Sequence, residues 1–530
     1  MRDFTIFPVL GLRTNVPYTD PSLFVSVGDS AAMTHCVDCR NIDFTRIRNA
    51  CSKSEGRAEW SNSAVGTPSY CLGIFELYDG TNRVVWMAYD GDMYRFDSAR
   101  DPGEIADAGA TAFASDQGDL YSFIRYGNHM VFSDYGEHTP YCSDFNDANL
   151  VKLISGGTEF KFRYLGSFAR RIIGMYSDQS NGNIEIRWSN ANPTPNTDCE
   201  FAAANQLYVP NDDPITGGSK MGTNAFFVYC ENSINRLDYY TNYATPFGFT
   251  TTVDGQGFVN HHSIINENGL NYGYNTNYGF CAYDGGRALI PIGTEIENWT
   301  KSIRYQYANL IVGASLPYAN SLIWTVPLEG SSIPNALLIY DYVERKWTRR
   351  DFEATYISRF INATNVTWTK LTTEMGYTTW ESLGALRWAD LIDETPTIGC
   401  SSTDGKLYSL TSESDAGSDY DGYRVEPALS FGGFNTYSIL SEIWFSIVYG
   451  SSFNLYVYYR GADTEIELRT AKWIALEEVS FNSPKDAVCR LNNSDLTAKR
   501  LHQIKWGTDA ENEQFVVNQI KFYYDFAGRY

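Results

Sequence analysis

The chain has 530 residues, of which 43% are hydrophobic and 20% charged, and its formal net charge at pH 7 is −22. This length accommodates about three to four domains with separate cores. Affinity for nucleic acid comes from Lys and Arg side chains that displace counterions. A chain as acidic as this one is therefore not expected to bind DNA tightly. The charge is explained either by solubility or by a surface that repels DNA.

The residue types favour an all-β protein. Aromatic residues make up 15% of the chain, with 38 Tyr, 30 Phe and 12 Trp, and 43 Gly accompany many Asn and Asp. Aromatic and β-branched side chains suit a pleated, half-buried surface, while Gly, Asn and Asp suit turns. Amphipathic helical stretches are scarce.

Residues 1–60 read as an irregular N-terminal arm, because prolines and polar residues interrupt them. This start lacks the basic, apolar and small-residue segments of a signal peptide. No stretch approaches the roughly 18 apolar residues of a spanning helix. We therefore expect synthesis in the cytoplasm and no membrane insertion.

A cysteine cluster in this arm leaves a metal site open. Cys36 and Cys39 form a C-x2-C pair after His35, and Cys51 and Cys71 follow at loose spacings. Structural zinc normally needs a second tight pair. Buried thiols are therefore the favoured interpretation, and no metal or cofactor is predicted.

Residues 61–414 carry a repeat of apolar strand, acidic or Asn turn and aromatic strand. Asp-Gly and Asn turns allow the positive φ that tight hairpins require. Pairs of such hairpins form four-stranded sheets, and radial repetition of these sheets gives a β-propeller of roughly six to seven blades. An array of β-sandwiches is the alternative. The turns occur in YDGDMYRFD (89–97), SDQGDLYSF (115–123), CENSINRLD (230–238), YDGGRALIP (283–291) and TDGKLYSLT (403–411).

One unit, LLIYDYVERKWTRRDF at 337–352, reads as the inner strands of a blade. Its Trp347 is expected to pack between neighbouring blades.

Residues 415–530 follow the polar linker SESDAGSDYDG and are predicted to form a C-terminal β-sandwich. Alternation with a period of two over long segments indicates strands with one buried face. These segments are EIWFSIVY (442–449), FNLYVYYR (453–460), EIELRTAKWIAL (465–476) and QFVVNQIKFYYDF (514–526).

Catalytic motifs are absent from the sequence. There is no G-x-S-x-G elbow, H-E-x-x-H pair or phosphate loop, and no carboxylate spacing identifies a glycosidase pair. His261 and His262 read as loop histidines. The basic pairs Arg170–Arg171, Arg345–Lys346 and Arg349–Arg350 read as solvated turns. We therefore predict no catalytic, cofactor-binding or metal residues, and no enzyme.

Several phrases resemble the tail hub or nozzle proteins of short-tailed phages, the packaged-DNA stabilisation family with a β-propeller. The resemblance spans nearly the whole chain. It is carried by GLRTNVPYTDPSLF (11–24), CRNIDFTRIRNACSKSEG (39–56), IEIRWSNANPTP (184–195), SINRLDYYTNYATPFGFTTTVDGQGFVNHHSI (233–264), YGFCAYDGGRAL (278–289) and TDGKLYSL (403–410).

The resemblance implies a structural virion protein located in the tail. Members of this family form a ring of six copies that closes the DNA channel below the portal and adaptor, and they carry tail fibres or spikes. The N-terminal arm would contact the ring. An acidic channel would let genomic DNA pass without specific binding.

Two other classes stay open. One is a carbohydrate-binding or carbohydrate-degrading receptor-binding propeller, because aromatic-rich loops such as NYGYNTNYGF (271–280) suit stacking on sugars. The other is a cellular scaffold propeller, which would be a stable monomer.

Overall fold

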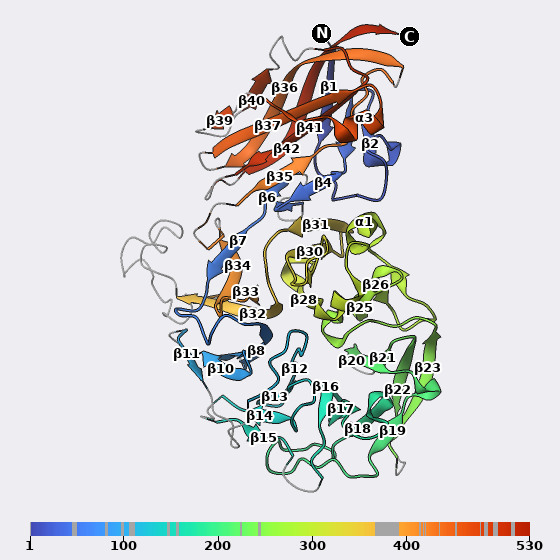
Figure 1. The fold of residues 1–530 in the computed structure, drawn as a ribbon, viewed down its shortest axis with the longest axis vertical. Helices are drawn as coiled ribbons and strands as arrows, with labels where there is room; N and C mark the ends of the chain where they lie inside the picture. Colours follow the sequence, from blue (N-terminus) through green and yellow to red (C-terminus); the bar gives the residue numbers. More distant parts are fainter. Residues whose placement is uncertain are drawn as a thin grey trace, which may run out of the picture.

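The structure is a computed structural model of the 530-residue chain (Figure 1). It describes residues 2–529 apart from 45–49, 80–82, 97–99, 105–111, 146–148, 155–157, 223–224, 242–244, 366–391, 413–414, 417, 419, 434, 451–452, 477–478, 482–485, 491–496, 510–512 and 514.

Seven four-stranded antiparallel sheets follow one another along the chain. Their first strands contact one another in sequence, and the seventh returns to the first, so the sheets close into a seven-bladed propeller. The prediction of a propeller is confirmed. The blades are β8 (Cys71–Tyr78), β9 (Arg83–Tyr89), β10 (Asp92–Phe96), β11 (Pro102–Glu104); β12 (Ser122–Tyr126), β13 (His129–Ser133), β14 (Tyr141–Ser143), β15 (Val151–Lys152); β16 (Phe162–Phe168), β17 (Arg171–Ser177), β18 (Glu185–Trp188), β19 (Gln206–Tyr208); β20 (Ile215–Met221), β21 (Ala225–Cys230), β22 (Ser233–Tyr239), β23 (Phe247–Asp254); β24 (Ile265–Glu267), β25 (Leu270–Asn275), β26 (Gly279–Tyr283), β27 (Ile290–Pro291); β28 (Val312–Leu316), β29 (Ser321–Val326), β30 (Ala336–Asp341), β31 (Lys346–Arg350); and β32 (Tyr356–Asn365), β33 (Ile392–Ser401), β34 (Leu407–Ser412) with β7 (Gly56–Glu59).

Turn chemistry builds the blades as the sequence predicts. Between β9 and β10, Asp90 and Gly91 have φ of 54° and 80°. These angles fit the two-residue hairpin turn that matches the twist of its strands. Blade seven takes its outer strand, β7, from the start of the chain, where Ala58 pairs with Ser409. Strands distant in sequence therefore close the circle.

A second domain consists of two sheets. The larger contains β1 (Arg2–Phe7), β2 (Phe24–Gly28), β3 (Ala31–Thr34), β5 (Ile42–Asp43), β6 (Cys51–Lys53), β36 (Thr436–Gly450), β40 (Asp486–Arg490) and β42 (Phe515–Arg529). The smaller contains β4 (Asp38–Arg40), β35 (Gly422–Val425), β37 (Phe453–Ala462), β38 (Ile474–Ala475), β39 (Val479–Phe481) and β41 (Leu501–Thr508).

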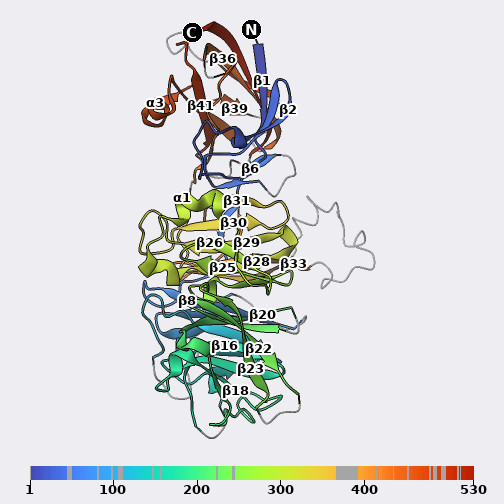
Figure 2. The same ribbon diagram turned by 90° about the vertical axis from the view of Figure 1, so that its right-hand side faces the viewer.

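Aromatic contacts join the inner faces of these sheets. The ring of Trp506 on β41 lies 5.7 Å from Phe445 of β36 and 5.6 Å from Phe515 of β42. We call this domain the terminal sandwich, since both chain ends lie in it, beyond the propeller (Figures 1 and 2).

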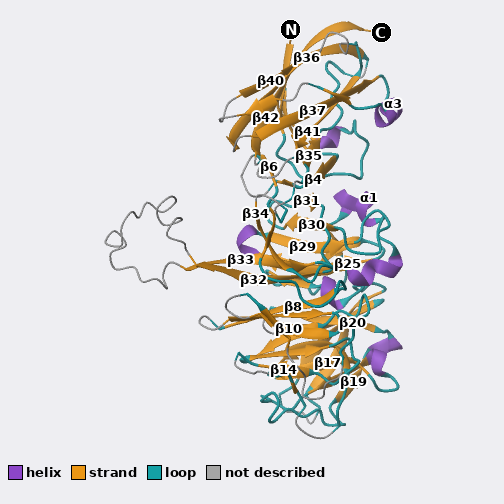
Figure 3. Ribbon diagram, turned by 60° about the vertical axis from the view of Figure 1, so that its left-hand side comes forward, coloured by secondary structure: helices purple, strands orange, loops and turns teal. Residues whose placement is uncertain are grey.

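Helices are short and lie in connections (Figure 3). Within the described ranges, none has the length and apolar character needed to cross a membrane. They are α1 (Glu297–Thr300), α3 (Glu465–Thr470) and the 3-10 turns η1 (Pro21–Leu23), η2 (Gly182–Ile184), η3 (Pro210–Asp212), η4 (His261–Ser263), η5 (Thr294–Ile296), η6 (Tyr305–Leu310) and η7 (Pro317–Ala319).

Three sequence-based expectations need correction. Residues 1–60 do not form an irregular arm, because β1 lies between β3 and β42 and β7 completes blade seven. The segment 337–352 supplies the two outer strands of blade six, β30 and β31, although its Trp347 does contact blade five. The segment 465–476 forms α3 and β38. Thr464 caps that helix through the Glu467 amide, and Arg469 pairs with Glu465 one turn away.

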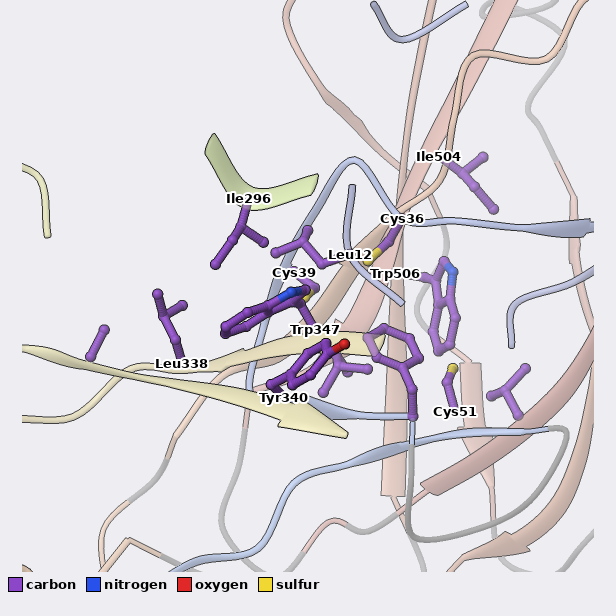
Figure 4. Packing of buried hydrophobic residues seen from close by; sticks show 14 of the residues in the cluster. Leu12, Cys36, Cys39, Cys51, Ile296, Leu338, Tyr340, Trp347, Ile504 and Trp506 are labelled. Carbon is purple, nitrogen blue, oxygen red and sulfur yellow. The ribbon is translucent and has the colours of Figure 1, made fainter. Parts of the chain in front are cut away.

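Blade six joins the propeller to the terminal sandwich. The Leu12 amide donates to the Trp347 carbonyl at 3.0 Å, and the Asn41 amide donates to Arg349 at 2.9 Å. One continuous hydrophobic cluster runs from Phe280 of blade five through Trp347 to Trp506 of the sandwich. Figure 4 shows Trp347 and Tyr340 packed beside Leu12 and Cys39 at this junction.

Candidate functional site

Residues around the starts of the innermost strands of five consecutive blades, the second to the sixth, converge on one pocket. We call it the central pocket; its volume is 290 Å³. Since the innermost strands surround the propeller axis, the pocket lies at the axial end where these strands begin. Its lining residues are Gly118, Tyr135, Arg163, Tyr164, Tyr176, Asn183, Pro214, Ile215, Thr216, Glu231, Val259, Asn260, His262 and Asn309.

Arg163 is held between two tyrosine rings in this pocket. Its guanidinium carbon lies 4.2 Å from the ring centroids of both Tyr135 and Tyr176. Cations above tyrosine faces are attracted by the ring quadrupole, and the flat guanidinium stacks well there. Within the described part of the chain, Arg163 forms no ion pair with a carboxylate. The clamp therefore fixes a cationic donor without neutralising it.

Both clamping tyrosines have unusual backbone angles. The φ values of Tyr135 and Tyr176 are 61° and 59°, in the left-handed region. For a bulky side chain this conformation is a genuine outlier, and such strain costs about 1–3 kcal/mol per residue. Two strained residues that hold the same guanidinium indicate that its position matters, because strain of this kind clusters at functional sites.

His261, the neighbour of the lining residue His262, connects three blades. Its Nδ1 accepts from the Gly218 amide at 3.3 Å, so the ring proton lies on Nε2, which donates to the Ser122 hydroxyl at 3.2 Å. The ring stacks on Tyr164 at 5.2 Å. Burial lowers the pKa of His261 to about 4, which keeps the ring neutral. A Cβ on Gly217 would lie 2.6 Å from the His261 Cα, so this close approach requires glycine.

His262 lines the pocket, and one of its ring nitrogens is buried without a partner. Its Nε2 is shielded from solvent and has no hydrogen-bond partner. The ring bonds to the Leu120 backbone, and burial holds its pKa well below the ordinary value. The turn that carries both histidines is fixed by Asn260, whose amide donates to the Asn309 carbonyl at 2.7 Å and whose Oδ1 accepts from the Ser263 amide at 2.6 Å. The sequence suggested that both histidines are free loop residues. The structure instead places them in the 3-10 turn η4, where their rings are held by the contacts described above.

Carboxylates surround the clamp. Glu231 is exposed at the pocket, and Asp119 follows the lining residue Gly118. Burial raises the pKa of Asp119 to about 6, and the nearby charges of Asp116 and Glu137 add to the shift. The guanidinium of Arg163 opposes it. The surroundings of the pocket are therefore acidic apart from this arginine.

A wider hollow of 1160 Å³ lies over blades three and four. Arg170 and the exposed Tyr239 and Tyr240 line it. Its second arginine, Arg236, is already paired with Asp238 at 2.7 Å. The central pocket, whose Arg163 forms no ion pair with any carboxylate of the described residues, is therefore the stronger candidate.

The remaining sequence-predicted candidates lie elsewhere. Cys36, Cys39, Cys51 and Cys71 are buried free thiols. In the described residues, no group of three or more His, Cys, Asp or Glu is placed to hold a metal ion. Burial raises the pKa of the Cys71 thiol to about 12, so that thiol is unreactive at neutral pH.

The basic pair Arg349–Arg350 is not a solvated turn. Only 4% of Arg349 and 8% of Arg350 are exposed. Arg349 pairs with Asp351 at 2.5 Å and with Glu329 at 3.2 Å. It therefore belongs to the junction between the domains.

Sequence reasoning missed Tyr135, Arg163 and Tyr176. These residues follow no motif, and they are separated by up to 41 positions. The Tyr135–Gly136 dipeptide in a turn was the only local signal. The sequence does not reveal which tyrosines adopt the left-handed backbone conformation.

Comparison with known proteins gives similarity to solved structures only. No protein-family model and no curated protein matches the sequence. One similar structure is an exo-β-1,3-galactanase from Phanerochaete chrysosporium with galactose, at 12% identity and a TM-score of 0.26, over 79% of this chain and 98% of that one. Another is a putative exported protein from Bacteroides fragilis, at 11% identity and a TM-score of 0.29, over 67% and 93%.

The galactanase corrects one expectation. The prediction that this chain is not an enzyme does not stand, because one of the solved structures that the chain matches is an exo-β-1,3-galactanase. At this identity and TM-score the match assigns no activity or substrate to the present chain.

Proposed function

We propose that this chain is a structural component of a short-tailed phage tail, the hub or nozzle ring below the portal and adaptor. The observation that carries the proposal is the terminal sandwich, which holds both chain ends at one pole of the molecule and ends in an edge strand (Figure 2). The outer edge of this strand pairs with no other strand of the described residues. That strand is β2, the last strand of its sheet. Val25 and Val27 on it are 49% and 51% exposed.

An exposed edge strand with apolar side chains is a template for another chain. When the second surface lies elsewhere on the same molecule, repeated contacts close into a ring if the rotation allows it. The phrases at 11–24 and 39–56 that resemble the phage family lie in this sandwich and at its border with blade six. A ring of six copies built through the sandwich would leave the propellers to carry fibres or spikes.

The net charge supports the same role. Each copy brings a formal charge of −22 to the ring. An acidic channel repels phosphates, so genomic DNA would slide through it without specific binding.

Ring formation tests the proposal. The purified chain, alone or with its tail adaptor, should sediment as a closed cyclic oligomer and show rings by electron microscopy. Val25→Asp and Val27→Asp should give folded monomers, because charges on an edge strand block pairing. Val343→Asp is the matched control, since Val343 is 61% exposed in the turn between β30 and β31. A chain that stays monomeric with the adaptor present would refute the proposal.

Carbohydrate recognition is a second candidate function, favoured by the central pocket. Its tyrosine rings, fixed arginine and carboxylate provide the stacking faces and polar groups that orient small polar ligands. A tail component that also binds glycans would combine both candidates.

A further inference from the structure

The central pocket combines donors and acceptors around aromatic faces. Arg163 presents N–H donors that no carboxylate in the described residues neutralises. Glu231, which is exposed at the pocket, supplies an acceptor.

The pocket size fits a ligand of about one ring. Its 290 Å³ lies just below the roughly 300–1,000 Å³ typical of small-molecule sites. Tyr135 and Tyr176, whose rings hold Arg163, are part of its wall. Exposed amides of Asn183 and Asn309 line the rim and can both donate and accept.

The charge of the surroundings selects among ligand classes. Asp116, Asp119 and Glu137 act on one another electrostatically beside Arg163. A further anion would be repelled by these carboxylates, even though the arginine alone would attract it. A metal cation lacks a ligand set in the described part of the chain. A neutral ligand with several hydroxyl groups meets neither difficulty.

We infer that the central pocket binds a neutral sugar ring, a hexose unit of a glycan. Arg163 and Glu231 hydrogen-bond its hydroxyl groups. The inference rests on the second candidate function and names its site and ligand class. Tyr135 and Tyr176 act as positioning residues, because their rings fix the plane of the guanidinium.

Titration calorimetry with a panel of sugars tests this inference. The probes are glucose, galactose, mannose, N-acetylglucosamine, glucuronate and galacturonate. At least one neutral sugar should bind, and its uronate should bind about ten-fold or more weakly. A uronate that binds more tightly than every neutral sugar would overturn the assignment of ligand class.

Variants locate the site. Arg163→Met should weaken binding of that sugar at least about ten-fold, because a hydroxyl group loses its charged donor. Arg236→Met, in the wider hollow, is the matched control and should leave affinity unchanged. Tyr176→Asn removes the ring while tolerating the left-handed backbone, so it should weaken binding with no loss in unfolding midpoint. A lower midpoint with unchanged affinity would show that Tyr176 is only structural.

The possible outcomes distinguish an error in the assigned pocket from an error in the proposed carbohydrate recognition. Sugar binding that survives Arg163→Met would leave carbohydrate recognition intact and overturn this pocket as its site. No binding of any neutral sugar at millimolar concentration would overturn both. Neither result would change the oligomeric state, which tests the tail proposal separately.

Discussion

At the scale of single residues, aromatic side chains connect the two domains. Trp347 is 1% exposed, and its indole N–H donates to the Ile292 carbonyl at 2.9 Å. Its ring centroid lies 5.4 Å from Phe280 in blade five. It lies 4.8 Å from Tyr340 in its own blade, and Figure 4 shows these two side chains together. Its carbonyl accepts from Leu12 of the N-terminal segment. One residue thus packs between two blades and beside the sandwich.

Trp347→Ala should lower the free energy of unfolding by about 3–5 kcal/mol, because it leaves a large cavity in a well-packed core. The unfolding midpoint in denaturant measures the loss. Tyr305→Ala, at a side chain that is 79% exposed, is the control and should have little effect. A fully stable Trp347 variant would mean that the residue lies in a surface site.

Asp119 gives a pH dependence with a defined sign. Its pKa in the folded chain is raised to about 6, mainly by burial, from an ordinary value of 3.8. The folded state therefore binds the proton more tightly than the unfolded state, and this contribution to stability is lost as pH rises from about 4 through about 6. Asp119→Asn should raise the melting temperature at pH 7 and change it little at pH 4.

Thermal unfolding between pH 4 and pH 7.5 measures this effect. The exposed Asp29, in the turn between β2 and β3, provides the control variant Asp29→Asn. If Asp119→Asn raised the melting temperature equally at both pH values, the carboxyl would not be the titrating group.

At the scale of elements, the N-terminal strands belong to both domains. β1 is hydrogen-bonded to β3 on one side and to β42 on the other. β7 forms the outer strand of blade seven. A propeller closed by strands from distant parts of the chain resists opening, because separating β7 from β34 breaks the backbone pairing between them.

Deletion of residues 1–60 should therefore abolish cooperative unfolding and leave the chain aggregated, since it exposes the edges of β42 and β34. Size-exclusion chromatography and thermal unfolding give the readout. Ile6→Asp on β1, where the side chain is fully buried, should act in the same direction, whereas Val25→Asp on the edge strand should remain folded. A soluble truncated chain with an unchanged midpoint would restore the interpretation of residues 1–60 as an accessory arm.

At the scale of the whole molecule, charge governs the proposed encounter with DNA. The ring should not retain duplex DNA at physiological salt, because its acidic groups oppose phosphates and release no counterions. Gel-shift titration of a short duplex from about 50 to 200 mM salt measures this. Tight binding that weakens steeply with salt would indicate a basic channel and contradict the sliding of DNA.

The sequence by itself determined the all-β class and the blade turns. The preferences of strand residues and of Asp-Gly or Asn turns depend on a few neighbouring positions only. They can therefore be recognised within one short segment, such as residues 89–97. Those turns occupy different places in different blades: Asp90–Gly91 joins the second and third strands of blade one, whereas Asp116 precedes the first strand of blade two. Local signals therefore indicated hairpins without indicating which strands were inner and which outer.

Only the tertiary structure decided which distant segments meet. Pairing of Ala58 with Ser409 and of Phe4 with Phe522 depends on the closure of the whole chain, because a strand edge accepts any partner of suitable pattern. The same holds for the central pocket. Tyr135, Arg163 and Tyr176 become one clamp only when neighbouring blades pack. The left-handed backbone of the two tyrosines is a conformation that their residue type does not favour.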